Sequence, residues 1–85
     1  MPIASTPRSI ILAIVAEEAL KAGVRAADIF SPRRLAPIVR ARHEAMKRVR
    51  EALPDKSYPE LGRIFGRNHA TVMYAVGAYR RPAKR

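Results

Sequence analysis

The chain has 85 residues, and 17 lysines and arginines against 7 aspartates and glutamates give it a formal net charge of +10. At this length we expect one domain with one small core, and a hydrophobic content of 48% excludes a disordered polycation. The absence of cysteine excludes disulfides, thiolate zinc sites and cysteine nucleophiles, and it is compatible with a reducing cytosol.

The first predicted helix covers residues 7–22. Thr6 is an N-cap, Pro7 takes the first helical position and Gly23 is the C-terminal stop. Apolar residues recur at steps of three and four, at Ile10, Ile11, Ile14, Val15, Ala19 and Leu20. The apolar run at residues 10–16 is too short to span a bilayer and lacks a cleavage-like end, so we interpret it as the buried stripe of this helix.

A single helical turn is predicted at residues 26–30, with Ile29 and Phe30 pointing inward. Ser31 ends this turn, because a residue that precedes a proline avoids the α conformation. The charge balance changes at the same point. Residues 1–30 contain 3 basic and 3 acidic side chains, whereas residues 31–85 contain 14 basic and 4 acidic ones. This asymmetry favours a polyanionic partner.

The next predicted helix runs from about residue 37 to about residue 53. At about 100° per residue its apolar side chains form one arc, made of Ile38, Val39, Ala45, Met46, Val49, Ala52 and Leu53. The other arc is polar, and the spacings of Glu44 to Arg48 and of Lys47 to Glu51 predict salt bridges on a solvent face.

Arg42 breaks this pattern, because it projects from the apolar arc near the start of the helix. A long side chain at such a position either snorkels outward or reaches past the helix end. An internal ion pair with Glu60 or Asp28 is a further structural interpretation.

Two short helices joined by a glycine-containing turn are predicted over about residues 57–80. Ser57 and Glu60 match the S-x-x-E capping box of the first helix, which ends at Gly66, and Asn68 caps the second helix. Their inward residues are Leu61, Ile64 and Phe65, then Val72, Ala75, Val76 and Tyr79. This arrangement is the helix-turn-helix pattern within an all-α helical bundle.

In helix-turn-helix proteins the second helix lies in the major groove and its first residues touch base edges. The outward residues at that position are Asn68, His69, Ala70 and Thr71. Together with the basic charge they predict nucleic-acid binding. The structural alternative for His69 is a partly buried histidine that bridges the two helices.

Residues 31–76 resemble the C-terminal DNA-binding domain, domain IV, of DnaA, the bacterial chromosomal replication initiator. The matching segments are SPRR at 31–34, VRARHEAM at 39–46, SYPELG at 57–62 and FGRNHATV at 65–72. The last of these resembles the family signature that ends in Asp-His-Thr-Thr-Val. The resemblance covers more than half of the chain and implies an all-α, DnaA C-terminal domain-like fold that binds double-stranded DNA.

The resemblance also implies roles for single residues. Arg34 matches an arginine that enters the minor groove, and a solvated loop arginine is the alternative. Arg42 matches a phosphate-contacting arginine, and His43 stands where the family has glutamine, also at a phosphate. Further DNA-binding residues are expected at Arg50, Lys56, Ser57, Tyr58, Pro59 and Arg67, and base contacts at Asn68, His69, Ala70 and Thr71.

Structural alternatives exist for some of these positions. Arg50 and Lys56 belong equally to a salt-bridged solvent face, and Tyr58 to a capping structure. Asn68 and Ala70 depart from the family's Asp and Thr, and one residue fewer separates Phe65 from His69. Because an aspartate only accepts hydrogen bonds, whereas an asparagine pairs donor and acceptor with adenine, we expect a relaxed or shifted version of the family's DNA box.

The sequence contains no G-x-x-x-x-G-K-[ST] loop and no catalytic constellation. We therefore expect no enzyme, no cofactor, no metal site, no membrane contact and no small-molecule substrate. The leading hypothesis is a monomeric, sequence-specific DNA-binding protein of the bacterial cytoplasm and nucleoid. It would act in replication initiation control or as a small stand-alone regulator. Other DNA-bound copies and the full-length initiator are further partners through shared boxes.

Two alternatives belong to other functional classes. One is a nonspecific nucleoid-associated or RNA-binding basic protein, and the other is an interaction module for acidic partners. The expected organisation is a single DNA-binding domain over residues 1–85, with residues 1–6 and 82–85 disordered. Met1 fits a small stand-alone protein as well as a domain excised from a longer chain.

Overall fold

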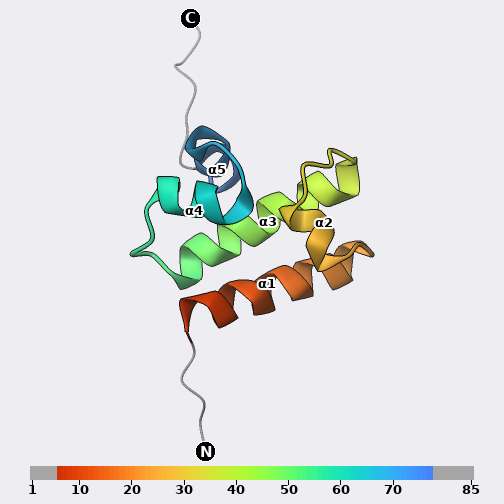
Figure 1. The fold of residues 1–85 in the computed structure, drawn as a ribbon, viewed down its shortest axis with the longest axis horizontal. Helices are drawn as coiled ribbons and strands as arrows, with labels where there is room; N and C mark the ends of the chain where they lie inside the picture. The colour runs from red at the N-terminus through yellow and green to blue at the C-terminus, as the bar shows by residue number, and fades with distance from the viewer. Residues whose placement is uncertain (1–5, 78–85) are drawn as a thin grey trace, which may run out of the picture.

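The computed structural model describes residues 6–77. They form five helices and no strand: α1 (Pro7–Ala22), α2 (Ala26–Phe30), α3 (Ala36–Ala52), α4 (Tyr58–Phe65) and α5 (His69–Ala75). Figure 1 shows α1 and α3 running in opposite directions side by side, with α4 and α5 on the far side of α3 from α1. The predicted all-α fold class is confirmed. Within this range no helix has the length and hydropathy needed to cross a bilayer.

The helix ends follow the local capping chemistry. The Thr6 hydroxyl accepts a hydrogen bond from the Ser9 amide at 3.1 Å, and Gly23 ends α1 in the left-handed conformation with φ 72°. The capping box of Ser57 and Glu60 is present in both directions. Thr6 therefore belongs to the ordered start of α1 rather than to a disordered end.

The last helix is shorter than predicted. We expected helical structure to about residue 80, whereas α5 ends at Ala75 and Gly77 adopts a left-handed φ of 82°. A glycine is costly inside a helix and readily takes this conformation, so it stops the helix there. The expected inward position of Tyr79 and the expected disorder of residues 1–5 and 82–85 lie outside the described residues.

All five helices contribute to one hydrophobic core. Its largest fully buried side chains are Val15, Ile29, Met46, Val49, Leu61, Phe65 and Val72. Phe30 is half-buried and stacks on Phe65, with ring centroids 5.7 Å apart and ring planes 22° from parallel. The inward orientation predicted for Ile29 and Phe30 is confirmed.

Two predicted core positions are exposed instead. Leu20 is 82% exposed, and Ala52 lies exposed in the last turn of α3. The buried face of α1 is set by Ile11 and Ile14, and at about 100° per residue Leu20 lies roughly 180° from Ile11. The position that continues the buried face is Glu18, which is only 5% exposed.

Glu18 belongs to an ion-pair cluster that joins α1 to α3. Arg48 Nη1 lies 2.9 Å from Glu18 Oε2, and Arg48 Nη2 lies 2.8 Å from Glu17 Oε1. Lys21 Nζ approaches the same Glu18 oxygen at 3.0 Å. Because a buried carboxylate needs partners, the two cations compensate the charge that this packing buries.

These contacts overturn the predicted pairing of Glu44 with Arg48, since Arg48 extends across to α1. The predicted pair of Lys47 with Glu51 is likewise absent among the ion pairs of residues 6–77. Residues four apart on a helix lie near each other, so Glu44 is within reach of Arg48. The buried Glu18 on α1 competes for the same Arg48 side chain and binds it instead.

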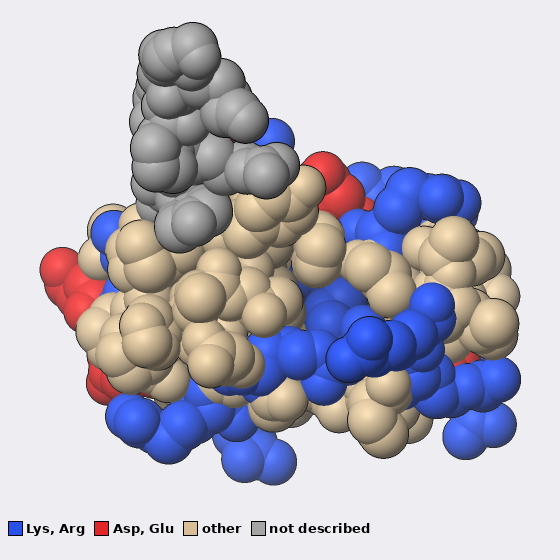
Figure 2. All heavy atoms as spheres, turned by 90° about the horizontal axis from the view of Figure 1, so that it is seen from above, with Lys and Arg blue, Asp and Glu red and all other residues tan. Residues whose placement is uncertain are grey.

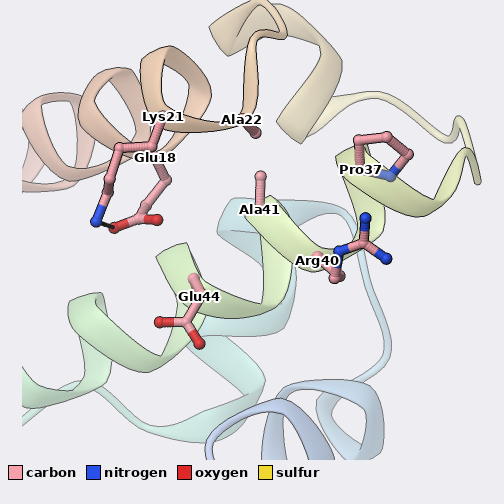
Figure 3. A pocket seen from close by; sticks show the side chains of 7 residues that line it. All are labelled: Glu18, Lys21, Ala22, Pro37, Arg40, Ala41 and Glu44. Carbon is pink, nitrogen blue, oxygen red and sulfur yellow. Dashed lines mark ion pairs between the residues drawn. The ribbon is translucent and has the colours of Figure 1, made fainter.

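An open hollow of about 250 Å³ lies beside this cluster, between α1 and α3. Figure 3 shows Glu18 and Lys21 joined on α1, Ala22 and Ala41 facing each other across the two helices, and Arg40 and Glu44 on α3. The Glu18 carboxylate is already paired, so we interpret the hollow as a feature of helix packing.

The cluster predicts a specific acid sensitivity. Burial raises the pKa of Glu18, but hydrogen bonds from Arg48 and Lys21 outweigh burial and hold it below the ordinary value of 4.5. A carboxylate with a lowered pKa stabilises the fold above its unfolded pKa, and this contribution is lost as pH falls through the folded pKa. We expect the free energy of unfolding to decrease below about pH 4.5, and Glu18→Gln to flatten that decrease, as measured by urea unfolding.

Glu44→Gln is the matched control, because it removes an exposed carboxylate that forms no ion pair within residues 6–77 and leaves the cluster in place. Its acid-dependent decrease should match that of the unaltered protein. Equal flattening in both variants would contradict the role assigned to the buried carboxylate.

Candidate nucleic-acid interface

The predicted helix-turn-helix is present as α4, a turn at residues 66–68, and α5. Gly66 takes a left-handed φ of 66°, which allows the chain to reverse directly after α4. The Arg67 amide then donates to the Gly62 carbonyl at 2.7 Å. The turn is therefore held against the helix that precedes it.

The start of α5 is open to solvent. Asn68, His69 and Ala70 are exposed and Thr71 is half-buried. The exposure of His69 rules against the alternative in which it bridges the two helices from a buried position. The exposed polar side chains of Asn68 and His69 thus lie at the end of α5 that contacts bases in helix-turn-helix proteins.

Asn68 is both N-cap and candidate reading residue. Its Oδ1 accepts a hydrogen bond from the Ala70 amide at 2.7 Å, as expected for an asparagine cap. Its side-chain nitrogen has no hydrogen-bond partner among residues 6–77. The cap therefore occupies the acceptor atom and leaves the amide NH₂ group as the group available to a ligand.

Several predicted DNA-binding residues meet around one open hollow of about 340 Å³. Its lining comes from the loop before α3, from α3 itself, from the turn and from α5, and consists of Arg34, Val39, Arg42, His43, Arg67 and Thr71. Segments far apart in the sequence therefore form one basic concavity beside the recognition helix.

His43 supplies a neutral imidazole to this hollow. Burial lowers its pKa below the ordinary value of 6.5, and the positive charges of Arg42 and Arg67 lower it further. The ring is half-buried and meets the ring of Tyr74 edge-on, with centroids 6.3 Å apart. Without a bound ligand the neutral form of the ring is therefore favoured at neutral pH.

Arg42 is the most buried cation in the part of the chain that the structure describes, with 2% of its surface exposed. Its Nε donates to the Ile29 carbonyl at 2.7 Å, and its Nη2 approaches the carbonyls of Ser31, Arg33 and Asp28 at 2.7, 3.0 and 3.1 Å. The snorkelling arginine and the ion pair with Glu60 or Asp28 are therefore wrong, whereas the bonds to the segment before α3 agree with the interpretation that the side chain reaches past the helix end. Little of the side chain remains for the implied phosphate contact.

The neighbouring loop carries two further arginines with different surroundings. Arg33 forms an ion pair of 3.5 Å with Asp28. Arg34 is exposed, and its side chain makes no ion pair or hydrogen bond within residues 6–77. Arg34 thus carries its full charge in the solvent, as a residue that inserts into a DNA groove requires.

The remaining predicted residues lie at the connection of α3 to α4, away from the hollow: Arg50, Lys56, Ser57, Tyr58 and Pro59. Arg50 Nη1 donates to the carbonyls of Pro54 and Lys56, at 2.8 Å in each case. Its guanidinium carbon lies 4.7 Å from the centre of the Tyr58 ring, a cation–π contact. This contact packs Tyr58 against α3, while the cap of α4 is Ser57. The salt bridge expected for Arg50 on a solvent face is absent among the ion pairs of residues 6–77.

Basic side chains also form a band on the face seen from the α4–α5 side (Figure 2). Figure 2 views the molecule from the α4–α5 side and shows a band of lysine and arginine reaching the end where the loop before α3 lies. Acidic side chains in this view are few and lie near its edges. Such a band attracts a phosphate backbone independently of sequence.

Sequence reasoning missed the backbone partners of Arg42 and the ion pair of Arg33 with Asp28. One signal in the sequence was the charge of Arg42 on an apolar arc, which implied that the side chain has polar partners but did not identify them. A second signal was the predicted single-turn helix at residues 26–30, because the last carbonyls of so short a helix need donors from elsewhere.

Comparison with known proteins also identifies a helix-turn-helix domain. A family model described as the bacterial DnaA protein helix-turn-helix matches residues 8–78. Over 54 residues, 62% of this chain, the sequence is 46% identical to chromosomal replication initiator proteins DnaA. Those of Methylibium petroleiphilum, Herminiimonas arsenicoxydans and Ralstonia nicotianae are covered over 11%, 12% and 10% of their lengths.

The chain therefore spans about a tenth of the length of the curated relatives that it matches. No solved structure matches it significantly.

The close packing of the turn on α4 predicts that Gly62 tolerates no side chain. A Cβ atom there would overlap the Arg67 carbonyl oxygen and lie 3.4 Å from the His69 amide nitrogen. We expect Gly62→Ala to destabilise the fold by about 1–3 kcal/mol, as measured by thermal unfolding followed by circular dichroism.

Arg63→Ala is the control, since it changes the adjacent exposed position of α4 and should alter stability by no more than about 0.5 kcal/mol. An unfolding temperature of Gly62→Ala equal to that of the unaltered protein would show that the turn has room to shift.

Proposed function

The chain belongs to the bacterial DnaA helix-turn-helix family, and from this premise we propose that it reads a short, specific sequence in double-stranded DNA. The observation that carries this proposal is that two exposed elements lie at one basic hollow, which Arg34, Arg67 and Thr71 line. These elements are the uncharged start of α5 at Asn68, His69 and Ala70, and Arg34, whose side chain is unpaired within residues 6–77. Sequence-specific recognition needs groups that face base edges in addition to charge.

In this proposal α5 enters the major groove, and the loop before α3 places Arg34 in the adjacent minor groove. A narrow minor groove in A·T-rich DNA has an enhanced negative potential, which attracts an inserted arginine. Arg34 then reads groove shape, whereas Asn68, His69, Ala70 and Thr71 read base edges. The domain acts by binding and contributes no chemical step.

Contacts to phosphates set the register of the protein on the duplex. The residues proposed for this part are His43, Arg67, Lys56 and the start of α4 at Ser57, Tyr58 and Pro59. His43 acts there as a hydrogen-bonding group. Arg50, which holds the α3–α4 connection through two carbonyls, would support this surface rather than make the contact itself.

The biological role that fits is control of replication initiation or regulation by occupancy of the same boxes. The matched relatives are chromosomal replication initiator proteins. Because Asn68 and Ala70 depart from the family's residues, the protein would compete with a full-length initiator in the bacterial nucleoid only at the boxes that both recognise. Binding is proposed to be monomeric, with neighbouring copies on neighbouring boxes.

Selection from a random duplex library, followed by salt-titrated binding of the selected duplex, tests the proposal. We expect the selected duplex to bind about a thousandfold or more tightly than a scrambled one. Arg34→Ala should weaken specific binding by about 1–3 kcal/mol and change nonspecific binding little. The control Arg40→Ala removes an exposed charge from α3 beside the α1–α3 hollow and should affect both duplexes equally.

Equal affinity for selected and scrambled duplexes would instead identify a nonspecific nucleoid or RNA-binding protein. Both alternatives predict a steep loss of affinity with salt, because each neutralised phosphate releases counterions. The ratio between the two duplexes is therefore the deciding quantity.

The capping geometry of Asn68 gives a second prediction. Since Oδ1 is engaged with the Ala70 amide, Asn68 is proposed to act on DNA as a donor through its NH₂ group. Asn68→Asp keeps an N-cap but replaces the donor by an acceptor. Repeating the library selection should therefore change the preferred base at one position, toward a donor such as cytosine N4. An unchanged selected sequence would show that Asn68 only caps the helix.

A further inference from the structure

Two arginines from different elements converge on one backbone oxygen. The Ser31 carbonyl accepts from Arg42 Nη2 at 2.7 Å and from Arg67 Nη2 at 3.0 Å. Arg42 lies on α3, whereas Arg67 lies in the turn immediately before α5. We call Arg42, Arg67 and the carbonyls that they hold the arginine clamp.

The clamp holds a loop that has few other long-range contacts. Residues 32–35 are exposed, so no side chain anchors the loop in the core. Its local ties are the Ser31 hydroxyl, bonded to the Asp28 carbonyl at 2.6 Å, and the ion pair of Arg33 with Asp28. These ties connect the loop only to α2.

The clamp therefore fixes the loop relative to the recognition helix. Arg42 binds the carbonyls of Ser31 and Arg33, and Arg33 directly precedes the proposed minor-groove residue Arg34. Arg67, which directly precedes Asn68, binds the Ser31 carbonyl of the same loop. One network thus sets the separation of the two elements that face DNA.

We propose that Arg42 and Arg67 are positioning residues, which align Arg34 in the minor groove with the start of α5 in the major groove. This inference rests on the proposed DNA-binding function; it replaces the phosphate contact implied for Arg42 and gives Arg67 a second part beside its proposed phosphate contact. They determine specificity through the loop, and Arg42 makes no phosphate contact.

The burial of Arg42 separates this role from a direct one. With 2% of its surface exposed, Arg42 neutralises no phosphate on binding. The slope of log affinity against log salt counts neutralised phosphates and falls by about 1 for each contact that a mutation removes. Loss of Arg42 should therefore leave the slope unchanged while specific affinity falls.

A double-mutant cycle with Arg34→Ala tests the positioning role. The variants are Arg42→Met, Arg67→Met and the control Arg40→Met, each with and without Arg34→Ala, measured on the selected and a scrambled duplex. Once the loop is misplaced, Arg34 contributes little. We expect Arg34→Ala to weaken specific binding at least about threefold less in Arg42→Met and Arg67→Met than in the unaltered protein, within the coupling range known for interacting residues.

In the control background the effect of Arg34→Ala should be additive. Arg40 is exposed on α3 and makes no contact with the loop among residues 6–77, yet it carries the same charge. Additive effects in Arg67→Met as well would overturn the inference, as would a salt slope reduced by about 1 in Arg42→Met.

Arg67→Met keeps the test decisive if Arg42→Met does not fold, since Arg67 is half-buried and provides only one arm of the clamp. Amide hydrogen exchange without DNA gives a further readout. The Arg33 amide, which donates to the Ser31 hydroxyl at 3.2 Å, should exchange faster in Arg67→Met than in Arg40→Met, and equal rates would contradict the clamp. A wild-type protein that does not discriminate the two duplexes refutes the proposed function and this inference together, whereas specific binding with additive effects refutes the inference alone.

Discussion

The five-residue α2 ends in carbonyl oxygens that need hydrogen-bond donors from outside the helix, and the neighbouring part of the molecule is arranged to supply them. The last carbonyl oxygens of a helix have no partners within it, and a buried carbonyl without a donor is costly. Arg42 meets this requirement from α3, because a guanidinium carries five N–H donors in a rigid plane. Its bond to the Ile29 carbonyl supplies a donor at the end of α2, and its bond to the Asp28 carbonyl adds to those from the Ser31 amide and hydroxyl. Its bonds to Ser31 and Arg33 extend the same contact into the following loop. The position of the proposed minor-groove arginine thus depends on the completion of a short helix.

The basic residues divide according to the oxygens that they meet. Arg48, Lys21 and Arg33 meet carboxylates, so their charges are compensated within the protein. Arg50 and Arg67 meet carbonyls, which order the side chain but leave its unit charge uncompensated. Carbonyl bonding therefore orders Arg50 and Arg67 on the side proposed to face DNA and leaves their charges uncompensated. The ion pairs within residues 6–77 lie in the cluster that joins α1 to α3 and between Arg33 and Asp28 at the end of α2.

Capping chemistry explains why most helix limits were predictable from the sequence. Thr6, Ser57 and Asn68 each bond to an amide within three residues, so the necessary information is local. The family motifs likewise identified the helix-turn-helix. The partners of Arg42 and Arg48 were not predictable, because several oxygens lie within reach of an arginine and tertiary packing selects among them. Leu20 was misplaced because the choice of buried face depends on where the neighbouring helix lies, and Glu18 continues that face instead.

The partners of the arginine clamp are all main-chain atoms. Every residue has a carbonyl oxygen, so the clamp itself does not depend on the side chains of the loop, although the Ser31 hydroxyl and Arg33 also tie the loop to α2. At Arg34, whose side chain takes no part in these contacts within residues 6–77, support and recognition are therefore chemically independent. A loop built in this way is suited to diversification, because its side chains can be exchanged for others of different groove preference while the same frame presents them.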